Sequence, residues 1–289
     1  MFDHIAQPIS YQHIELSFPV HLDIKRLDLV HPQISGNKFF KLKYNLLAAK
    51  EQGLSSILTF GGAYSNHIAA TAYAAHLFGL KSIGIIRGEE LAGKPLNPTL
   101  AKAQSLGMQL HFVSRHEYRL RDDANYLQQF PQTYIIPEGG SNELAVQGCQ
   151  EILSQYDLEQ YDVICCAVGT GGTISGLIER SAAHQKVLGF SALKGDFLQQ
   201  AIRQWTKKQN WSLTDVYCWG GYAKTSPELF AFIENFEEQY AAPLEPIYTG
   251  KMMFGLFDLI KNNYFPENTR ILAIHSGGLQ ADIRNKPHT

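Results

Sequence analysis

The chain has 289 residues, of which 45% are hydrophobic and 18% charged, and its formal net charge is −2. This composition is sufficient for a large buried core and excludes global disorder. The near-neutral charge gives no reason to expect nucleic acid or an anionic membrane as a partner, and no run approaches the roughly 18 apolar residues of a membrane span.

We expect a cytoplasmic protein without a metal site. The N-terminal residues show no basic segment followed by an apolar one, so they do not predict a secretory signal. The cysteines lack the CxxC or Cys/His spacing of metal ligands, and two of them lie inside an apolar run. This usage is typical of reduced core cysteines in a cytosolic protein, here Cys149, Cys165, Cys166 and Cys218.

Short apolar strands alternate with helices along most of the chain. A strand at 24–28 and a helix at 38–50 are followed by strands at 57–60, 82–86, 109–113 and 134–136, with helices at 65–78, 97–106 and 118–130. After a helix at 143–153 come strands at 163–168, 187–190, 216–219 and 270–275, with helices after residue 173 and at 197–207, 227–240 and 252–261. This alternation predicts βαβ units and parallel sheets covered on both faces, and therefore an α/β fold of two closely packed lobes.

Lys38 lies in an unusual setting near the start of the first predicted helix. Phe39 and Phe40 follow it directly, and Lys41 places a second cation nearby. Apolar surroundings and a neighbouring cation lower the pKa of a lysine and favour the neutral amine, which can form a Schiff base with a carbonyl compound. The alternative is that both lysines are solvated charges on the first turn of the helix.

A glycine-rich segment at 169–173 follows the most apolar predicted strand and opens a helix. Glycines allow a ligand to approach the backbone, and free N–H groups at a helix start bind anions. The spacing matches neither a dinucleotide fingerprint nor a Walker loop, so the segment favours an isolated phosphate group. A tight strand-to-helix turn without a ligand is the alternative.

Two further glycine-containing turns follow predicted strands, at 61–67 and at 276–278. Ser65 or Asn66 could serve simply as a helix N-cap. Free N–H groups at this helix start would also hold a carboxylate or a ring oxygen. In open α/β sheets ligands lie at the carboxyl ends of strands, so the three turns together indicate a binding site.

These segments resemble those of the fold-type II pyridoxal-phosphate enzymes, in particular the family of 1-aminocyclopropane-1-carboxylate deaminase and D-cysteine desulfhydrase. The resemblance covers essentially the whole chain and rests on the order and spacing of segments 25–28, 35–42, 61–67, 169–173, 248–251 and 275–278. It implies pyridoxal 5'-phosphate as cofactor, a small amino acid as substrate and a homodimer. We expect a large cofactor-binding domain formed by 1–50 and 144–289, and a small α/β domain formed by 51–143.

The resemblance also implies roles for individual residues. Lys38 would be the Schiff-base lysine, and Asn66 would hydrogen-bond the ring hydroxyl of the cofactor. Its phosphate would be held by Gly169, Thr170, Gly171, Gly172 and Thr173, together with Lys41.

On the substrate side, Ser65 would touch the substrate and assist proton transfer, within a substrate-facing loop that includes Asn66 and His67. Tyr222 and Tyr248 match the two active-site tyrosines of the family. Without the family pattern, a capping serine and two core tyrosines would account for the same residues.

Thr249 and Ser276 distinguish the subgroups of this family. The cyclopropane deaminases that the chain resembles carry Glu and Leu at these two positions, whereas the D-cysteine desulfhydrases carry small hydroxyl residues. A carboxylate beside the pyridine nitrogen keeps it protonated and strengthens the electron sink, while a hydroxyl leaves it largely neutral, which suffices for β-elimination. These residues therefore favour β-elimination on a D-amino acid such as D-cysteine, giving pyruvate, ammonia and sulfide.

Three alternatives stay open from the sequence. The first is a 1-aminocyclopropane-1-carboxylate deaminase or a lyase for another small amino acid. The second is a binding or regulatory protein that kept the cofactor fold, although such a protein would be expected to lose Lys38 or the segment at 169–173. The third is a fold-type II enzyme for L-amino acids, which the segment at 248–251 and the tyrosine positions disfavour.

Overall fold

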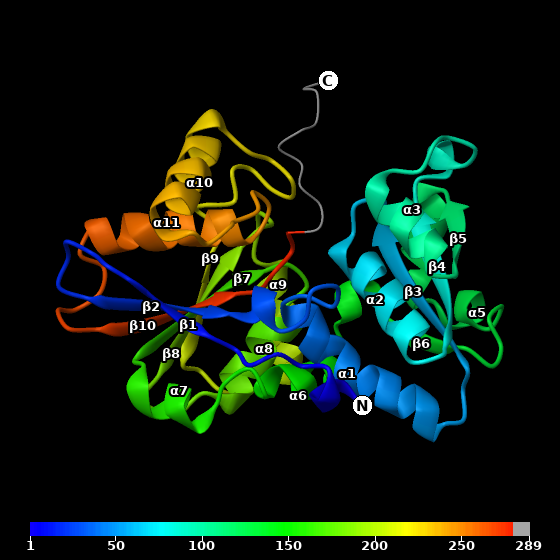
Figure 1. The fold of residues 1–289 in the computed structure, drawn as a ribbon, viewed down its shortest axis with the longest axis horizontal. Helices are drawn as coiled ribbons and strands as arrows, with labels where there is room; N and C mark the ends of the chain where they lie inside the picture. The colour runs from blue at the N-terminus through cyan, green and yellow to red at the C-terminus, as the bar shows by residue number, and fades with distance from the viewer. Residues whose placement is uncertain (280–289) are drawn as a thin grey trace.

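The computed structural model describes residues 1–279 and consists of two lobes, each built on its own sheet (Figure 1). The larger sheet has six strands in the order β1-β2-β10-β7-β8-β9, all parallel except for the antiparallel pair β1 and β2. These strands are β1 (Tyr11–Ile14), β2 (His21–Arg26), β7 (Val163–Val168), β8 (Lys186–Ser191), β9 (Trp211–Thr214) and β10 (Arg270–His275). The α/β fold of two parallel-sheet lobes flanked by helices is therefore as predicted.

The smaller sheet is fully parallel, with the order β5-β4-β3-β6. Its strands are β3 (Ser56–Gly62), β4 (Lys81–Arg87), β5 (Met108–Val113) and β6 (Tyr134–Ile136). The helices of this lobe are α2 (Asn66–Leu77), α3 (Pro98–Ser105), α4 (Arg115–Tyr118) and α5 (Ala124–Leu127). The boundaries of the small domain, 51–143, stay a prediction.

Helices cover both faces of the larger sheet. On one face lie α10 (Pro227–Tyr240) and α11 (Thr249–Lys261), and on the other α6 (Glu143–Gln150), α7 (Gln155–Gln160), α8 (Gly172–Arg180) and α9 (Phe197–Trp205) (Figure 1). Because β7 lies between covered faces, all six of its residues are buried, which explains its uninterrupted apolar sequence. The four cysteines are buried and form no disulfide.

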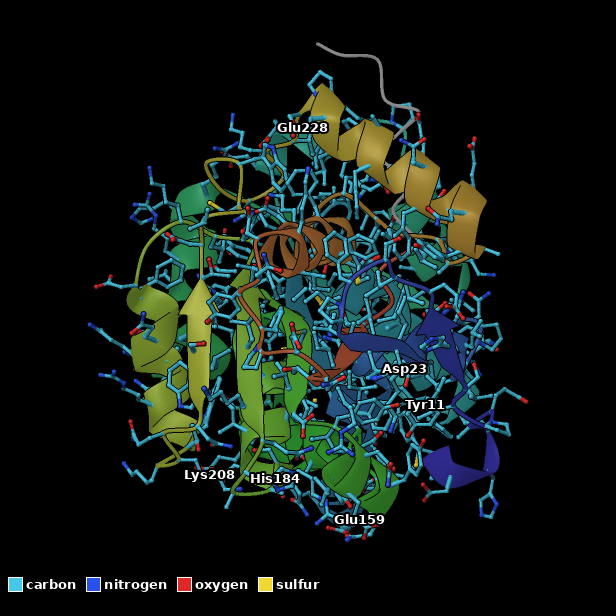
Figure 2. The ribbon with its side chains drawn as sticks, turned by 90° about the vertical axis from the view of Figure 1, so that its left-hand side faces the viewer. Tyr11, Asp23, Glu159, His184, Lys208 and Glu228 are labelled. Carbon is cyan, nitrogen blue, oxygen red and sulfur yellow. The ribbon has the colours of Figure 1, made fainter. Side chains whose placement is uncertain are left out.

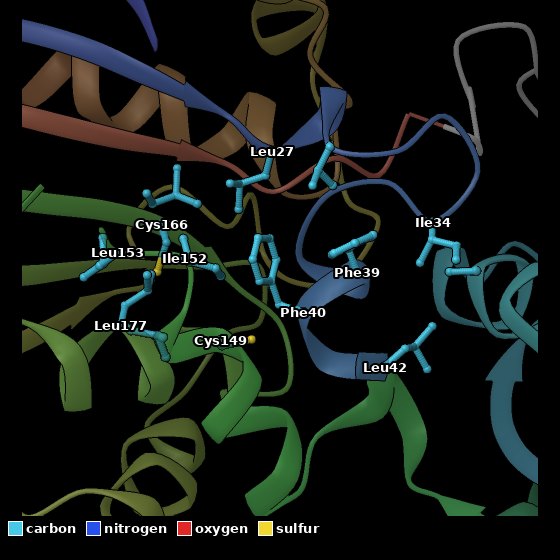
Figure 3. Close-up of a cluster of buried hydrophobic side chains, with 14 of the residues drawn as sticks. Leu27, Ile34, Phe39, Phe40, Leu42, Cys149, Ile152, Leu153, Cys166 and Leu177 are labelled. Atoms are coloured by element: carbon cyan, nitrogen blue, oxygen red, sulfur yellow. The ribbon is translucent and has the colours of Figure 1, made fainter. Parts of the chain in front are cut away.

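The long helix α1 (Asn37–Glu51) runs between the two lobes (Figure 1). Phe39 and Phe40 project from its first turn into the main hydrophobic core, where they pack with residues such as Leu27, Ile152 and Leu177 (Figure 3). This burial holds the start of the helix, and with it Lys38, against the large lobe.

The amino ends and the carboxyl ends of the parallel strands lie at opposite edges of the large sheet. Figure 2 shows the large lobe from the side remote from the small lobe, with Glu159, His184 and Lys208 at its periphery. Each of these three residues precedes a strand, so they mark the amino ends of β7, β8 and β9. The glycine-rich turns lie at the opposite, carboxyl ends. Within residues 1–279 no helix is both long and apolar enough to cross a membrane.

Some element predictions were wrong. Residues 216–219 form turns instead of a strand, because Val216 is 78% exposed and the rings of Tyr217 and Trp219 pack against Phe254 of α11. Strand β8 pairs instead with β9, which ends just before residues 216–219. The helix predicted at 118–130 is divided, because the Asp123 side chain accepts a hydrogen bond from the Tyr126 N–H and starts a new short helix there.

Candidate active site

A cavity of about 580 Å³ is lined by both lobes at the carboxyl ends of β3, β4, β7 and β10. Most of the residues predicted for the site line it: Lys38, Lys41, Ser65, Asn66, His67, Gly169, Thr170, Gly171, Thr173, Tyr222, Tyr248 and Ser276. Gly172 and Thr249 are the two predicted residues that do not. The fold thus gathers into one cavity segments that are far apart in the sequence.

The amine of Lys38 is held by a short chain of side-chain hydrogen bonds. Its Nζ donates to Asn37 Oδ1 at 2.9 Å, and Asn37 Nδ2 donates to Thr173 Oγ1 at 2.8 Å. The side chain borders the cavity, and the surrounding protein desolvates the amine. This burial, with a smaller contribution from the Lys41 charge, lowers the pKa of Lys38 to about 7. A large fraction of the amine is therefore neutral, and hence nucleophilic, near neutral pH.

Lys41 lies one turn further along α1 and points at the glycine-rich segment. Its Nζ donates to the carbonyl oxygen of Gly139 at 3.0 Å, to Ser141 Oγ at 2.8 Å and to Thr170 Oγ1 at 3.3 Å. Burial lowers the pKa of Lys41 to about 8. No carboxylate bonds to this amine among the described residues, so an anion at the same point would satisfy its charge.

The segment at 169–173 has the geometry of an anion-binding cradle. Gly171, with φ of +88°, is the N-cap of α8, so the first N–H groups of that helix have no acceptor within it. A Cβ at Gly169 would lie 3.0 Å from the Tyr248 ring, which shows how closely the strand end meets its neighbour. Free amides, two threonine hydroxyls and the Lys41 amine together suit a phosphate group.

The turn after β3 opens α2. Ser65 is the N-cap of this helix, and its Oγ accepts a hydrogen bond from the Ile68 N–H at 3.3 Å, so its capping role is real and coexists with a place in the cavity wall. The Oδ1 atom of Asn66 is buried and has no hydrogen-bond partner among residues 1–279. A buried amide without a partner at a cavity indicates a ligand group that completes it.

The His67 side chain is buried behind this turn. Its Nε2 lies 2.7 Å from Thr59 Oγ1, and because that hydroxyl donates to the Ile136 carbonyl, the imidazole must carry its proton on Nε2. Nδ1 is left as a buried acceptor without a partner in the described part of the chain. Burial, together with the Lys38 and Lys41 charges, holds the pKa of His67 well below its usual value. Its contact with substrate stays a prediction.

The two tyrosines stand together at the cavity. The rings of Tyr222 and Tyr248 make an edge-to-face contact with 6.1 Å between centroids, and Tyr222 is 48% exposed. Burial raises the pKa of Tyr248 well above its usual value, so its phenol is a hydrogen-bond donor at neutral pH.

Thr249 and Ser276 occupy different environments. Ser276 lines the cavity, whereas Thr249 is fully buried at the start of α11 and bonds to Glu245. Thr249 Oγ1 lies 3.1 Å from Glu245 Oε1, to which it donates, and it accepts from the Glu245 N–H at 3.1 Å. The predicted contact of Thr249 with the cofactor therefore stays a prediction.

Several residues that hold the side chains around the cavity were not predicted from the sequence. Asn37 and Ser141 position the two lysines, and Glu245 accepts hydrogen bonds from the amides of residues 247, 248 and 249. These partners are distant in sequence or lie in loops without a pattern. Arg87 and Arg115 also line the cavity. Arg87 ends a parallel strand and precedes Gly88, and that position was a usable signal.

The residues present fit a phosphorylated aldehyde cofactor. A desolvated amine suits covalent attachment of an aldehyde, the cradle at 169–173 suits its phosphate, and the unpartnered Asn66 amide suits a polar group on its ring. These features are those expected of an α/β enzyme with a site for such a cofactor at the carboxyl ends of its strands.

Comparison with known proteins identifies the family. The model of the pyridoxal-phosphate dependent enzymes matches residues 17–277, and the chain belongs to this family. A putative 1-aminocyclopropane-1-carboxylate deaminase from Thermotoga maritima is 31% identical over 94% of this chain and 93% of its own length. The bifunctional D-cysteine desulfhydrase/1-aminocyclopropane-1-carboxylate deaminase, mitochondrial, of Arabidopsis thaliana is 30% identical over 96% of this chain and 77% of its own. A D-cysteine desulfhydrase from Klebsiella pneumoniae is 28% identical over 92% and 89%.

Solved structures show the same fold. The crystal structure of an ACC deaminase homologue matches with a TM-score of 0.81 at 24% identity, over 96% of this chain and 91% of that one. A hydrogen sulfide-producing enzyme from Fusobacterium nucleatum matches with a TM-score of 0.68 at 12% identity, over 96% and 98%. The protein is thus a pyridoxal-phosphate dependent enzyme of fold type II.

Proposed function

We propose that this enzyme is a lyase that catalyses β-elimination and deamination of a small D-amino acid such as D-cysteine, releasing pyruvate, ammonia and sulfide. The observation that carries this proposal is the Lys38 amine, desolvated and held by Asn37 at the same cavity as the cradle at 169–173. The names of the relatives include both D-cysteine desulfhydrases and 1-aminocyclopropane-1-carboxylate deaminases.

In this proposal, residues from both lobes take part in the reaction. Pyridoxal phosphate supplies an electron sink that stabilises negative charge at Cα of the substrate. Lys38 would hold the cofactor, and its amine, when free, would remove the Cα proton of the substrate. The amides at 169–173 and Lys41 would bind the phosphate, while the start of α2, with Ser65 and Asn66, would bind the substrate carboxylate.

Thr249 and Ser276 support the choice of reaction. Neither position carries a carboxylate to hold a proton on the pyridine nitrogen, and this suits elimination of a good leaving group from Cβ better than ring opening. The Glu245 carboxylate accepts a hydrogen bond from the Thr249 hydroxyl, but Glu245 does not line the cavity. Three backbone N–H groups also donate hydrogen bonds to this carboxylate. Deamination of 1-aminocyclopropane-1-carboxylate is the second candidate, favoured by the name of the Thermotoga maritima relative.

Keto-acid release from a panel of D- and L-cysteine, β-chloro-D-alanine and 1-aminocyclopropane-1-carboxylate tests the proposal. We expect turnover of the D-substrates with a β leaving group. The double variant Thr249→Glu with Ser276→Leu should shift activity toward the cyclopropane substrate and change the absorbance of the bound cofactor. Release from the L-isomers alone, or from the cyclopropane substrate alone in the wild type, would contradict it.

We also propose that the enzyme is a cytoplasmic homodimer, because the family resemblance implies two subunits and its four cysteines are buried and free of disulfides. Sedimentation velocity of the cofactor-loaded protein tests the number of subunits. A single species with the mass of two chains is expected, and a monomer across the micromolar range would refute it.

A further inference from the structure

Two arginines at the cavity have no role in the reaction described above. Arg87 is the last residue of β4, and Arg115 is the first residue of α4, separated from the end of β5 by one residue, Ser114. Since β4 and β5 are paired in parallel, with Arg87 opposite Val113, both arginines come from the same corner of the small lobe. Both line the cavity that also contains Lys38, Ser65 and Tyr222.

Neither guanidinium is neutralised by the protein. Among residues 1–279, neither the Arg87 side chain nor the Arg115 side chain makes an ion pair or a hydrogen bond, and the Arg87 guanidinium only stacks on the Tyr118 ring, with its Cζ 5.5 Å from the ring centroid. Both side chains are exposed at the cavity. A stacked guanidinium keeps its edge free for a planar or tetrahedral anion.

The one carboxylate in the described cavity wall is already paired. Glu138 Oε1 accepts a hydrogen bond from the Tyr118 hydroxyl at 2.8 Å, and Oε2 lies 3.0 Å from Arg121 Nε. Arg121 therefore balances the charge of Glu138, and Arg87 and Arg115 are left as surplus positive charge.

The cofactor and the substrate backbone do not account for this surplus. The cofactor phosphate has its own cradle on the large lobe, formed by 169–173 and Lys41. In the proposed function, the start of α2 binds the α-carboxylate. D-Cysteine offers no further negative group, because its side chain ends in a thiol.

We infer that the natural substrate is an amino acid whose side chain ends in an anionic group, such as a carboxylate or a phosphate, and that Arg87 and Arg115 bind this group. The inference rests on the proposed function for the reaction and the orientation of the substrate, and it replaces D-cysteine, as the natural substrate, by an amino acid with an anionic side chain. One hydrogen bond to a charged group corresponds to roughly tenfold to a hundredfold in affinity.

Binding of matched amino acids to the cofactor-loaded enzyme tests this directly. D-Serine and O-phospho-D-serine differ only in the phosphate, and D-aspartate replaces it with a carboxylate. The change in cofactor absorbance reports the dissociation constant without requiring turnover. We expect the two anionic compounds to bind at least tenfold more tightly than D-serine at low salt, with the tighter of the two identifying the anion. The difference should shrink at high ionic strength.

The double variant Arg87→Gln with Arg115→Gln should bind all three compounds within about threefold of one another, because it removes charge but leaves the binding of the α-carboxylate. Arg119→Gln, an exposed arginine outside the cavity, is the control and should keep the wild-type preference.

Equal binding in the wild type, or a preference that survives in the double variant, overturns the inference. An equal loss for D-serine and the anions also overturns it, because the arginines would then bind the α-carboxylate. If the binding preference appears but no keto acid is released from any amino acid, it is the proposed lyase function that fails.

Discussion

At the scale of single residues, the state of the Lys38 amine decides what the cavity can do. A lysine in water is protonated until pH values near 10.5, whereas burial and the Lys41 charge lower the pKa of Lys38 to about 7. A lowered pKa means that the reactive neutral amine is lost as the pH falls through this value and is fully present above it.

The rate at which cofactor-free enzyme attaches pyridoxal phosphate should therefore rise as the pH increases through about 7, and it should level off above about 8. Stopped-flow absorbance at constant ionic strength measures this rate. A rate that keeps rising in proportion to hydroxide up to pH 10 would show that Lys38 is an ordinary solvated lysine.

Asn37 is the residue that orients this amine, since it accepts from Lys38 Nζ and donates to Thr173 Oγ1. Removing one hydrogen bond costs about 1–2 kcal/mol, so Asn37→Ala should slow cofactor attachment about tenfold. Asn37→Asp should instead raise the pKa of Lys38 and move the pH profile upward, an effect that a purely structural role would not produce. Gln52→Ala, at the far end of the same helix, is the control and should match the wild type.

At the scale of elements, the junction between α1 and the turn after β10 has no spare room. Gly36, the N-cap of α1, has φ of +67° and ψ of −147°, a conformation essentially restricted to glycine. A Cβ at this position would lie 1.9 Å from the backbone oxygen of Ser276. The two segments that bear Lys38 and Ser276 are thus in backbone contact.

Gly36→Ala should destabilise the protein by about 3 kcal/mol or more, because left-handed strain and a backbone clash add together. Gly53→Ala is a matched control, since Gly53 has φ of +69° but nothing within 4 Å of an added Cβ, and it should cost only about 1–2 kcal/mol. Denaturant unfolding of both variants gives the comparison. Equal losses of stability would mean that the contact with the Ser276 backbone is of no consequence.

The elements that the sequence predicts well are those whose pattern is local. The apolar run of β7 and the N-caps of α2, α3 and α10 are contained in a few neighbouring residues. β1 could not be predicted, because it is an edge strand with a single buried residue, Ile14, and its pairing with β2 comes from contacts across the chain. Tyr217 and Trp219 read as a strand, but their rings join the aromatic cluster around Phe254.

At the scale of the whole molecule, the site is the place where the two lobes meet. The glycine-rich turns could be predicted, because a strand followed by glycines and a helix start is itself the signal. The partners Asn37–Thr173, Lys41–Ser141 and Thr249–Glu245 could not be predicted, because side-chain direction and helix packing decide which atoms meet. The charge balance that leaves Arg87 and Arg115 unpaired is likewise a property of the assembled cavity.

The covalent link between cofactor and protein gives the most direct test of the central claim. Borohydride reduction of the wild-type enzyme loaded with pyridoxal phosphate fixes the cofactor on the residue that holds it, and peptide mass mapping then identifies that residue. The structure predicts a single modified lysine, Lys38, and no modification in Lys38→Ala. Modification of Lys41 or of an exposed lysine, or no modification in the wild type, would contradict the assignment of this cavity as the active site.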